Sequence, residues 1–223
     1  MTNLILLRHG QSVFNRKNLF TGWVDVPLSP QGIEEARSAG AFLQNYTIDV
    51  GYVSDLIRAL MTAFLVLSVR GEECLPILFD EKQGPWSSLH GKELTGKFLP
   101  VYRDARLNER MYGELQGKDK QQVRDEFGQE QVHLWRRSYD TPPPGGESLE
   151  DNTKRTIPYF LETVLPRLEA GDNVLIVAHG NSLRAIIKWL KGLSAEEIVQ
   201  VEIPTGKPLV YSYNAGSFVE KEL

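Results

Sequence analysis

The chain has 223 residues, of which 41% are hydrophobic, so it is long enough to bury a sizeable core. Its formal net charge of -4 at pH 7 argues against a broad basic face for nucleic acid, and its single cysteine excludes an internal disulfide framework. No apolar run approaches the length of a membrane span, and the N-terminus has no signal-peptide pattern. We therefore expect a cytoplasmic protein without nucleic-acid or membrane partners.

The first part of the chain alternates predicted strands and helices. The continuous apolar run Leu4–Leu7 predicts a strand that is buried on both faces. Apolar residues at helical spacing after Ser29 predict a helix with that residue as its N-cap. A short strand is expected at Asp49–Ser54, followed by a helix that Ser54 or Asp55 would cap. This rhythm indicates a parallel sheet with helices on both faces.

Residues 71–106 are less regular. One strand is expected at Leu75–Phe79, but the rest of the segment is marked by Gly and Pro and is poorly periodic. We interpret the segment as a long connection or a small insertion. Such connections are uncommon inside compact domains and are often functional.

The second half begins with the polar stretch DKQQVRDEFGQEQVHLWRRSYD, which is expected to be helical in part. A capping box formed by Ser148 and Asp151 predicts the start of a helix, which Pro158 and Pro166 would kink or bound. NVLIVAHG predicts a strand, and SLRAIIKWLKG and SAEEIVQV predict two helices. A final hairpin is expected to turn at Asn214-Ala215-Gly216.

Two turns in the chain share one pattern. LLRHGQS places Arg8 and His9 after the first predicted strand, and IVAHGNS places His179 after a later one. Ligands of open α/β sheets bind beyond the carboxyl ends of strands, where helix N-termini also point. If the two strands are neighbours, the imidazoles face each other. Either histidine alone could be an ordinary satisfied residue at a loop end, but the repeated pattern favours a functional pair.

These residues suit a phosphoryl group better than a metal ion, because the arginine repels cations and no carboxylate adjoins the histidines. Arginine binds phosphate oxygens as a fork, and an imidazole nitrogen can become phosphorylated. Phosphoryl transfer also needs further cations and a proton donor, for which Arg58 and Glu109 are candidates. Arg136 and Arg137 would suit a second anion, such as a carboxylate. Taken singly, each of these four charges could be an ordinary solvated side chain.

Six segments match one family in the family's order and cover most of the chain. They are RHGQSVFNRKNLFTGWVDVPLSPQG, SDLIRALMTA, LNERMYGELQGKDK, FGQEQVHLWRRSYDTPPPGGESL, AHGNSLRAIIKWL and EIPTGKPLVY. Through them the chain resembles the histidine phosphatase superfamily and, within it, the cofactor-dependent phosphoglycerate mutases. The resemblance implies an α/β fold, a three-layer αβα sandwich with a mostly parallel central sheet. It also implies a single domain at residues 1–223, with a longer connection or insertion at about 71–106.

The resemblance implies a role for each residue of the matching motifs. His9 would be the phosphorylated nucleophile, and Arg8 and Arg58 would clamp the transferred phosphoryl group. His179 would stabilise its developing charge, and Glu109 would be the general acid/base. The positions that match the family's phosphate-binding and substrate-binding residues are Ser12, Asn15, Thr21, Gly22, Tyr112, Lys120, Arg136, Arg137, Gly180 and Asn181.

The resemblance further implies interconversion of 3-phosphoglycerate and 2-phosphoglycerate, a step of glycolysis and gluconeogenesis. The working form would carry a phosphohistidine that is primed by 2,3-bisphosphoglycerate, and no metal would be needed. The expected partners are small-molecule phosphoglycerates and a second copy of the chain in a homodimer. Because Arg8 and Arg58 should lower the pKa of His9, we expect activity to fall on the acid side as His9 protonates.

Two departures from the family pattern keep an alternative open. Met111 replaces the histidine that usually follows LNER, and the chain ends soon after the last hairpin, where longer members continue into a tail that covers the site. Water that reaches a phosphohistidine hydrolyses it, so a phosphatase for phosphoglycerates or another phosphoester is the first alternative. A non-catalytic binding protein is the second, but none of the five catalytic positions is lost.

Overall fold

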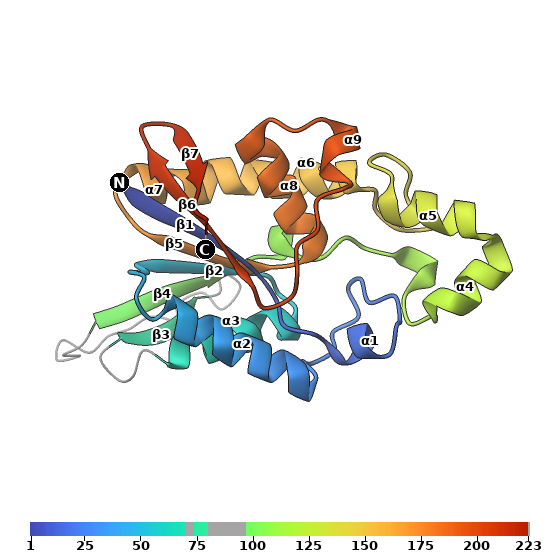
Figure 1. Cartoon of the computed structure of the whole chain (residues 1–223), viewed down its shortest axis with the longest axis horizontal. Coiled ribbons are helices and arrows are strands. Elements are labelled where there is room, and N and C mark those ends of the chain that lie inside the picture. Colours follow the sequence, from blue (N-terminus) through green and yellow to red (C-terminus); the bar gives the residue numbers. More distant parts are fainter. Residues whose placement is uncertain (70–73, 80–96, 223) are drawn as a thin grey trace.

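The computed structural model describes residues 1–69, 74–79 and 97–222. Within them, one sheet has the strand order β3-β4-β2-β5-β1-β6-β7. β6 pairs antiparallel with β1 and β7, and the other pairings are parallel (Figure 1). The strands are β1 Thr2–Arg8, β2 Val50–Val53, β3 Cys74–Phe79, β4 Lys97–Arg103, β5 Val174–Ala178, β6 Pro208–Asn214 and β7 Ser217–Glu220. The mostly parallel sheet confirms the predicted fold class.

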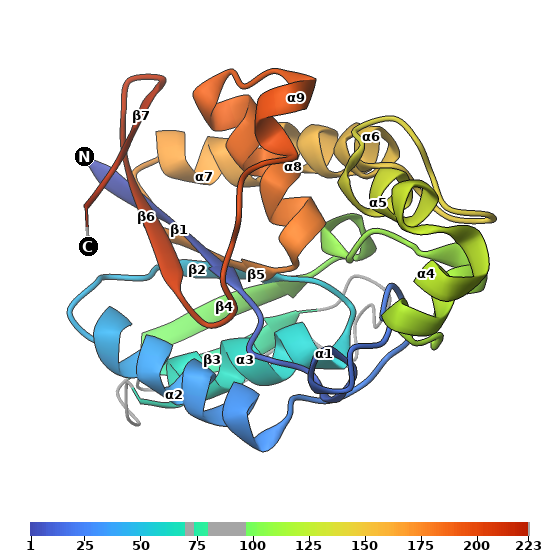
Figure 2. The same cartoon turned by 45° about the vertical axis from the view of Figure 1, so that its right-hand side comes forward.

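Helices cover both faces of the sheet (Figure 2). α2 and α3 pack on one face, and α6, α7 and α8 pack on the other. The helices are α1 Val13–Arg16, α2 Pro30–Leu43, α3 Ile57–Ser68, α4 Lys120–Phe127, α5 Gln129–Arg137, α6 Leu149–Tyr159, α7 Leu165–Glu169, α8 Gly180–Lys191 and α9 Ala195–Ile198. None of the helices in the described ranges is long and apolar enough to cross a membrane.

The central strand β1 explains why the apolar run at its position is continuous. Leu4 and Leu6 pack into the core under α6, α7 and α8, whereas Ile5 and Leu7 pack into the core under α2 and α3. Side chains of a strand alternate between the two faces, so a strand covered on both faces is apolar at every position.

Three of the predicted helix and turn signals are confirmed. The side chain of Ser29 accepts a hydrogen bond from the backbone of Gly32 at the start of α2. Ser148 and its partner at the third position form the expected capping box of α6. The final hairpin turns at Ala215 and Gly216, which have φ values of 46° and 86°.

The two prolines lie on either side of an irregular turn that interrupts the predicted helix. α6 ends one residue after Pro158, and α7 begins one residue before Pro166. Between them, Phe160–Val164 forms a π-turn in which the Leu165 N–H reaches the Phe160 carbonyl. Proline has no N–H to continue the regular pattern of helical hydrogen bonds, so the wider turn lies where that pattern fails.

The predicted cap of α3 was wrong. The residue that precedes the helix is Leu56, which makes no side-chain capping bond. Instead, Oδ1 of Asp25, from a distant loop, accepts the hydrogen bond of the Ile57 N–H at 2.6 Å. The hydroxyl of Ser54 lies 2.7 Å from a histidine of the site described below and accepts from the Leu56 N–H, which precedes the helix.

The interpretation of residues 71–106 was partly wrong. The expected strand is present as β3, but Lys97–Arg103 forms a second strand, β4, which lies between β2 and β3. Leu99 and Val101 of β4 are buried in the core beneath α2 and α3. Pro100 argues against a central strand in the sequence, because proline cannot donate to the ladder of hydrogen bonds. Residues 80–96 of the segment lie outside the described part of the chain.

The polar stretch that was expected to be partly helical contains two helices. α4 and α5 meet at Gly128, whose φ of 84° lies in the left-handed region. This conformation suits glycine and separates the two helices without a longer loop. Both helices lie beyond the carboxyl ends of β1 and β5 (Figure 1).

Candidate active site

The two His-Gly turns meet at one edge of the sheet. β1 and β5 are parallel neighbours, with Arg8 opposite Ala178, so the next residues are His9 and His179. The His9 N–H donates to the Ala178 carbonyl at 3.0 Å, and the centroids of the two imidazole rings lie 4.9 Å apart. The repeated sequence pattern therefore predicted a real contact.

His9 presents one nitrogen to the site. Its Nδ1 lies 2.7 Å from the Gly10 carbonyl oxygen, which can only accept, so Nδ1 carries the proton and Nε2 has a free lone pair. Burial lowers the pKa of His9 well below its ordinary value, and the charges of Arg58 and Arg8 lower it further. The imidazole is therefore neutral at physiological pH.

His179 is held by a residue that the sequence analysis assigned to a helix cap. Its Nε2 lies 2.7 Å from the hydroxyl of Ser54, which follows β2. Its Nδ1 is buried and has no hydrogen-bond partner. Burial lowers the pKa of His179 well below its ordinary value, with further lowering by the charge of Arg58. Only the pairing of β2 with β5 brings Ser54 here, so no local sequence signal could identify it.

Two arginines flank the histidines and are fixed by backbone carbonyls. Nη1 of Arg8 donates to Ile203 at 2.7 Å, and Nη2 of Arg58 donates to Gly22 at 2.7 Å. The Nε atoms of both arginines are buried and make no hydrogen bond. Burial lowers the pKa of Arg58 to about 10, so this side chain is still a cation at neutral pH. Arginines that line a cavity and keep unpartnered donors are suited to an anionic ligand.

The carboxylate of Glu109 lies in the same interior and is 8% exposed. Its Oε1 accepts hydrogen bonds from Nδ2 of Asn181 and from the backbone of Arg110, each at 2.8 Å. Burial raises the pKa of Glu109, but these hydrogen bonds and the charges of Arg58 and Arg8 outweigh it, and the net pKa is lowered. The group is therefore an ionised proton acceptor in the resting protein.

A cavity of about 130 Å³ joins these groups. Most of the predicted site residues line it, but Ser12 and His179 do not. The predicted residues at its wall are Arg8, His9, Asn15, Thr21, Gly22, Arg58, Glu109, Tyr112, Lys120, Arg136, Arg137, Gly180 and Asn181. The ring of His179 is tilted by 58° against that of His9. Ser12 is fully buried as the N-cap of α1, where its hydroxyl accepts from the Asn15 backbone.

Four residues of the cavity wall were not predicted: Leu19, Phe20, Arg184 and Glu202. Arg184 lies one helical turn after Gly180 on α8, and this spacing was a usable signal that it faces the same way. Glu202 lies on the loop between α9 and β6. A single exposed carboxylate carries no signal of this kind in the sequence.

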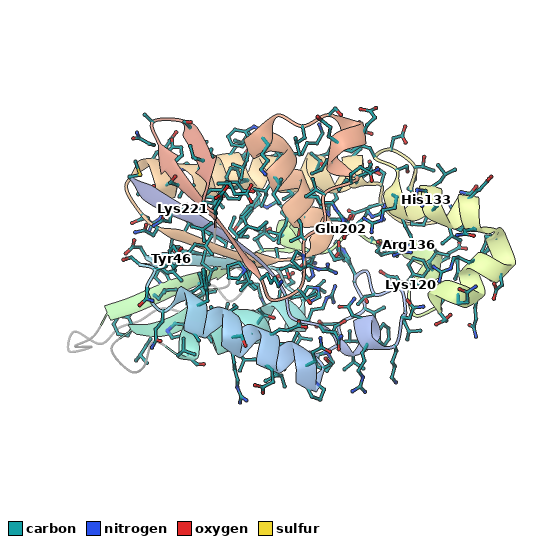
Figure 3. All side chains as sticks on the ribbon, viewed as in Figure 1. Tyr46, Lys120, His133, Arg136, Glu202 and Lys221 are labelled. Atoms are coloured by element: carbon teal, nitrogen blue, oxygen red, sulfur yellow. The ribbon has the colours of Figure 1, made fainter. Side chains whose placement is uncertain are left out.

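The cavity is basic although the whole chain is acidic. Six of its lining side chains are Arg or Lys, and two are Glu, whereas the chain has a net charge of -4. Lys120 and Arg136 come from α4 and α5 and line the cavity together with Glu202 (Figure 3). Within the described ranges, no group of three or more His, Cys, Asp and Glu side chains could hold a metal ion. The arrangement can bind a small multiply charged anion beside a neutral imidazole.

The sequence matches a known family along almost its whole length. Residues 4–83 and 89–223 match the family model of the histidine phosphatase superfamily (branch 1). The chain belongs to the histidine phosphatase superfamily.

Relatives within this superfamily are similar from end to end. A protein of Chlamydia muridarum is 50% identical over 100% of this chain and 99% of its own length. One of Chlamydia pneumoniae is 54% identical over 96% of this chain and 94% of its own, and one of Protochlamydia amoebophila is 49% identical over 100% of both. All three are named 2,3-bisphosphoglycerate-dependent phosphoglycerate mutase. They confirm the resemblance to the cofactor-dependent phosphoglycerate mutases.

Solved structures confirm the fold. Bacillus stearothermophilus YhfR has a TM-score of 0.77 and 25% identity, covering 99% of this chain and 95% of that one. A mycobacterial glucosyl-3-phosphoglycerate phosphatase in complex with VO3 also has a TM-score of 0.77 and 25% identity, covering 99% and 98%. The superfamily fold therefore carries enzymes with different names, and the site must decide the activity.

Proposed function

We propose that this protein is a 2,3-bisphosphoglycerate-dependent phosphoglycerate mutase that interconverts 3-phosphoglycerate and 2-phosphoglycerate in glycolysis and gluconeogenesis. The observation that carries the proposal is the pair of buried imidazoles, 4.9 Å apart, at a cavity with six basic side chains. The relatives that share this name match the chain from end to end at about half of its positions.

His9 is the proposed nucleophile, because Nε2 is its only nitrogen with a free lone pair. Arg8 and Arg58 neutralise the oxygens of the transferred group, and their unpartnered Nε atoms suit phosphate oxygens. His179 acts beside them: its Nε2 faces Ser54, and its unpartnered Nδ1 is the nitrogen that remains to meet the developing charge.

Glu109 is the proposed acid/base. As the N–P bond of phosphorylated His9 breaks and an O–P bond to the substrate hydroxyl forms, the ionised Glu109 accepts the hydroxyl proton. In the return step, the other O–P bond breaks, the Nε2–P bond forms again, and Glu109 gives the proton back to the leaving oxygen. Its hydrogen bonds from Asn181 and the backbone hold the carboxylate in place for both transfers.

The outer part of the cavity is the proposed binding site for the rest of the substrate. Lys120, Arg136 and Arg137 supply the charge for a carboxylate, and Tyr112 lines the same cavity. The pKa of Lys120 supports this grouping. Burial lowers it, and the positive charge of the neighbouring Arg136 lowers it further. Asn15, Thr21, Gly22, Gly180 and Asn181 complete the wall.

The same residues fit 2,3-bisphosphoglycerate, because cations lie at both the inner and the outer end of the cavity. Arg8 and Arg58 would hold one phosphate, and Arg136 and Arg137 would hold the opposite end. When bound, this compound supplies the phosphoryl group that primes the enzyme. We propose no metal.

Three further expectations remain proposals. The chain would act as one domain over residues 1–223, in the cytoplasm, and as a homodimer. These rest on the family resemblance and on the single sheet to which all described strands belong.

The proposed function is tested by phosphorus NMR of the pure protein with 3-phosphoglycerate, with and without a trace of 2,3-bisphosphoglycerate. We expect 2-phosphoglycerate to appear, to require the trace primer, and to be absent with His9→Ala. His133→Ala is the matched control, because His133 is an exposed histidine of α5 outside the cavity. Inorganic phosphate without 2-phosphoglycerate would instead identify a phosphatase, which is the first alternative.

A further inference from the structure

The carboxylate of Glu202 is paired with two arginine side chains in the outer part of the cavity. Oε1 of Glu202 lies 2.7 Å from Nη2 of Arg137, and its Oε2 lies 3.8 Å from Nη2 of Arg184. Both arginines line the cavity wall. Glu202 lines the same cavity as Lys120 and Arg136, which Figure 3 labels beside it. In the protein without substrate, an internal anion thus lies where an external one would be expected to bind.

The backbone on either side of Glu202 is fixed to the site. The Val201 carbonyl accepts from Nε of Arg184 at 2.8 Å, and the Ile203 carbonyl accepts from Nη1 of Arg8 at 2.7 Å. Ile203 itself is buried, at 1% exposure. The loop therefore fixes the backbone at Glu202 through two of the arginines of the cavity.

The side chain itself is free to leave its partners. The side chain of Glu202 is 68% exposed, and that of Arg137 is 30% exposed. Ion pairs in such settings contribute little, because water and salt compete for both charges. Glu109, the other carboxylate of the cavity, is buried and accepts several hydrogen bonds, so it is fixed. The two acidic residues of the cavity therefore have different roles.

We infer that Glu202 is a built-in counter-ion that competes with the outer carboxylate of the substrate for Arg137 and Arg184, and thereby sets how tightly the cavity holds anions charged at both ends. The inference rests on the proposed function, because it takes a phosphoglycerate as the ligand. A bound substrate carboxylate either displaces Glu202 from Arg137 or lies beside it as a like charge. Either event weakens the binding of the outer end of the substrate, while the inner phosphate is held by Arg8 and Arg58.

The experiment compares two ligands that differ in one group. Calorimetric titration measures the affinity of 3-phosphoglycerate and of glycerol 3-phosphate, which has a hydroxymethyl group in place of the carboxylate. The proteins are wild type, Glu202→Gln and Glu169→Gln. Glu169, at the end of α7, is an exposed glutamate outside the cavity, so its change alters the net charge equally.

We expect Glu202→Gln to bind 3-phosphoglycerate about three- to tenfold more tightly at low ionic strength. Its affinity for glycerol 3-phosphate should change by less than about twofold, because that ligand has no outer carboxylate. Glu169→Gln should match wild type with both ligands. At high salt, the gain of Glu202→Gln should shrink, since exposed charges are then screened.

Unchanged or weaker binding of 3-phosphoglycerate by Glu202→Gln would overturn the inference, because Glu202 would then only orient the arginines. An equal gain in affinity for both ligands would also overturn it, since that result would reflect the overall electrostatic potential of the cavity. If wild type binds glycerol 3-phosphate but not 3-phosphoglycerate, the proposed substrate is wrong and the inference fails with it.

Discussion

His9 and His179 lie side by side in the interior, and burial keeps both imidazoles uncharged. Burial is the largest cause of the lowered pKa of each, and the nearby guanidinium groups of Arg8 and Arg58 add to it. A neutral imidazole between two cations is what a phosphoryl acceptor needs, because the incoming oxyanions are attracted while the nitrogen keeps its lone pair.

This environment fixes the pH dependence of catalysis. The pKa of His9 is well below 6.5, so His9 stays neutral and active as the pH falls through 6.5, and it protonates only in more acid solution. We expect the rate at which 2,3-bisphosphoglycerate phosphorylates His9 to stay level as the pH falls through 6.5 and to fall only in more acid solution. A profile whose acid limb has its midpoint at or above 6.5 would contradict this environment for His9.

The residues of the site differ in how far the sequence could predict them. His9, Arg8, Arg58, Glu109 and His179 belong to motifs with a local pattern, and a family resemblance carries them. Ser54, Arg184 and Glu202 also lie in the matching segments, but the sequence analysis gave them no role at the site. They reach the site only through strand pairing, the helical repeat of α8 and a loop between α9 and β6.

At the scale of elements, the loop after α1 joins the N-terminus of α3 to the site. Asp25 caps α3 through the Ile57 N–H, and Arg58 of the same helix donates to the carbonyls of Gly22 and Val24. The loop therefore caps the helix that supplies Arg58 and accepts the hydrogen bonds that orient this arginine.

We predict that Asp25→Ala lowers the free energy of unfolding by about 1 kcal/mol, as expected for a lost helix cap. It should also raise KM, because Gly22 lines the cavity and its loop loses one anchor. Chemical denaturation and steady-state kinetics measure the two effects. Asp25→Asn keeps an oxygen acceptor and should recover most of both; if it behaves like Asp25→Ala, the hydrogen bond is not the cause.

The elements that the sequence predicted well are those whose signal is local. The strand at Leu4–Leu7 and the helix after Ser29 follow from continuous or periodic apolar residues and a capping side chain. β4 was missed because Pro100 interrupts the strand pattern, and its neighbours β2 and β3 supply the stability that the local sequence lacks. The cap of α3 was missed because it comes from a residue 32 positions away.

At the scale of the whole molecule, the buried histidines make stability depend on pH. Their pKa values are lowered in the folded state, so between the folded and unfolded values the unfolded chain binds more protons. Stability is therefore lost as the pH falls below 6.5. Glu109, whose folded pKa is also lowered, contributes stability that is lost only at pH values below its ordinary 4.5.

We predict that the free energy of unfolding falls between about pH 6.5 and pH 5, by up to about 1.4 kcal/mol per pH unit for each of the two histidines. Denaturant titrations at several pH values measure it. His9→Gln should lose about half of the slope. A free energy that stays constant over this range in the wild type would show that the histidines are not held neutral.

The most direct test of the account is the site of phosphorylation. The protein is incubated with 2,3-bisphosphoglycerate, kept at alkaline pH, and examined by phosphorus NMR and by mass spectrometry of its peptides. The account predicts one phosphoryl group on Nε2 of His9, because Nδ1 donates a hydrogen bond to the Gly10 carbonyl oxygen. A phosphoryl group on Nδ1 or on another residue, or no phosphoprotein at all, would contradict it.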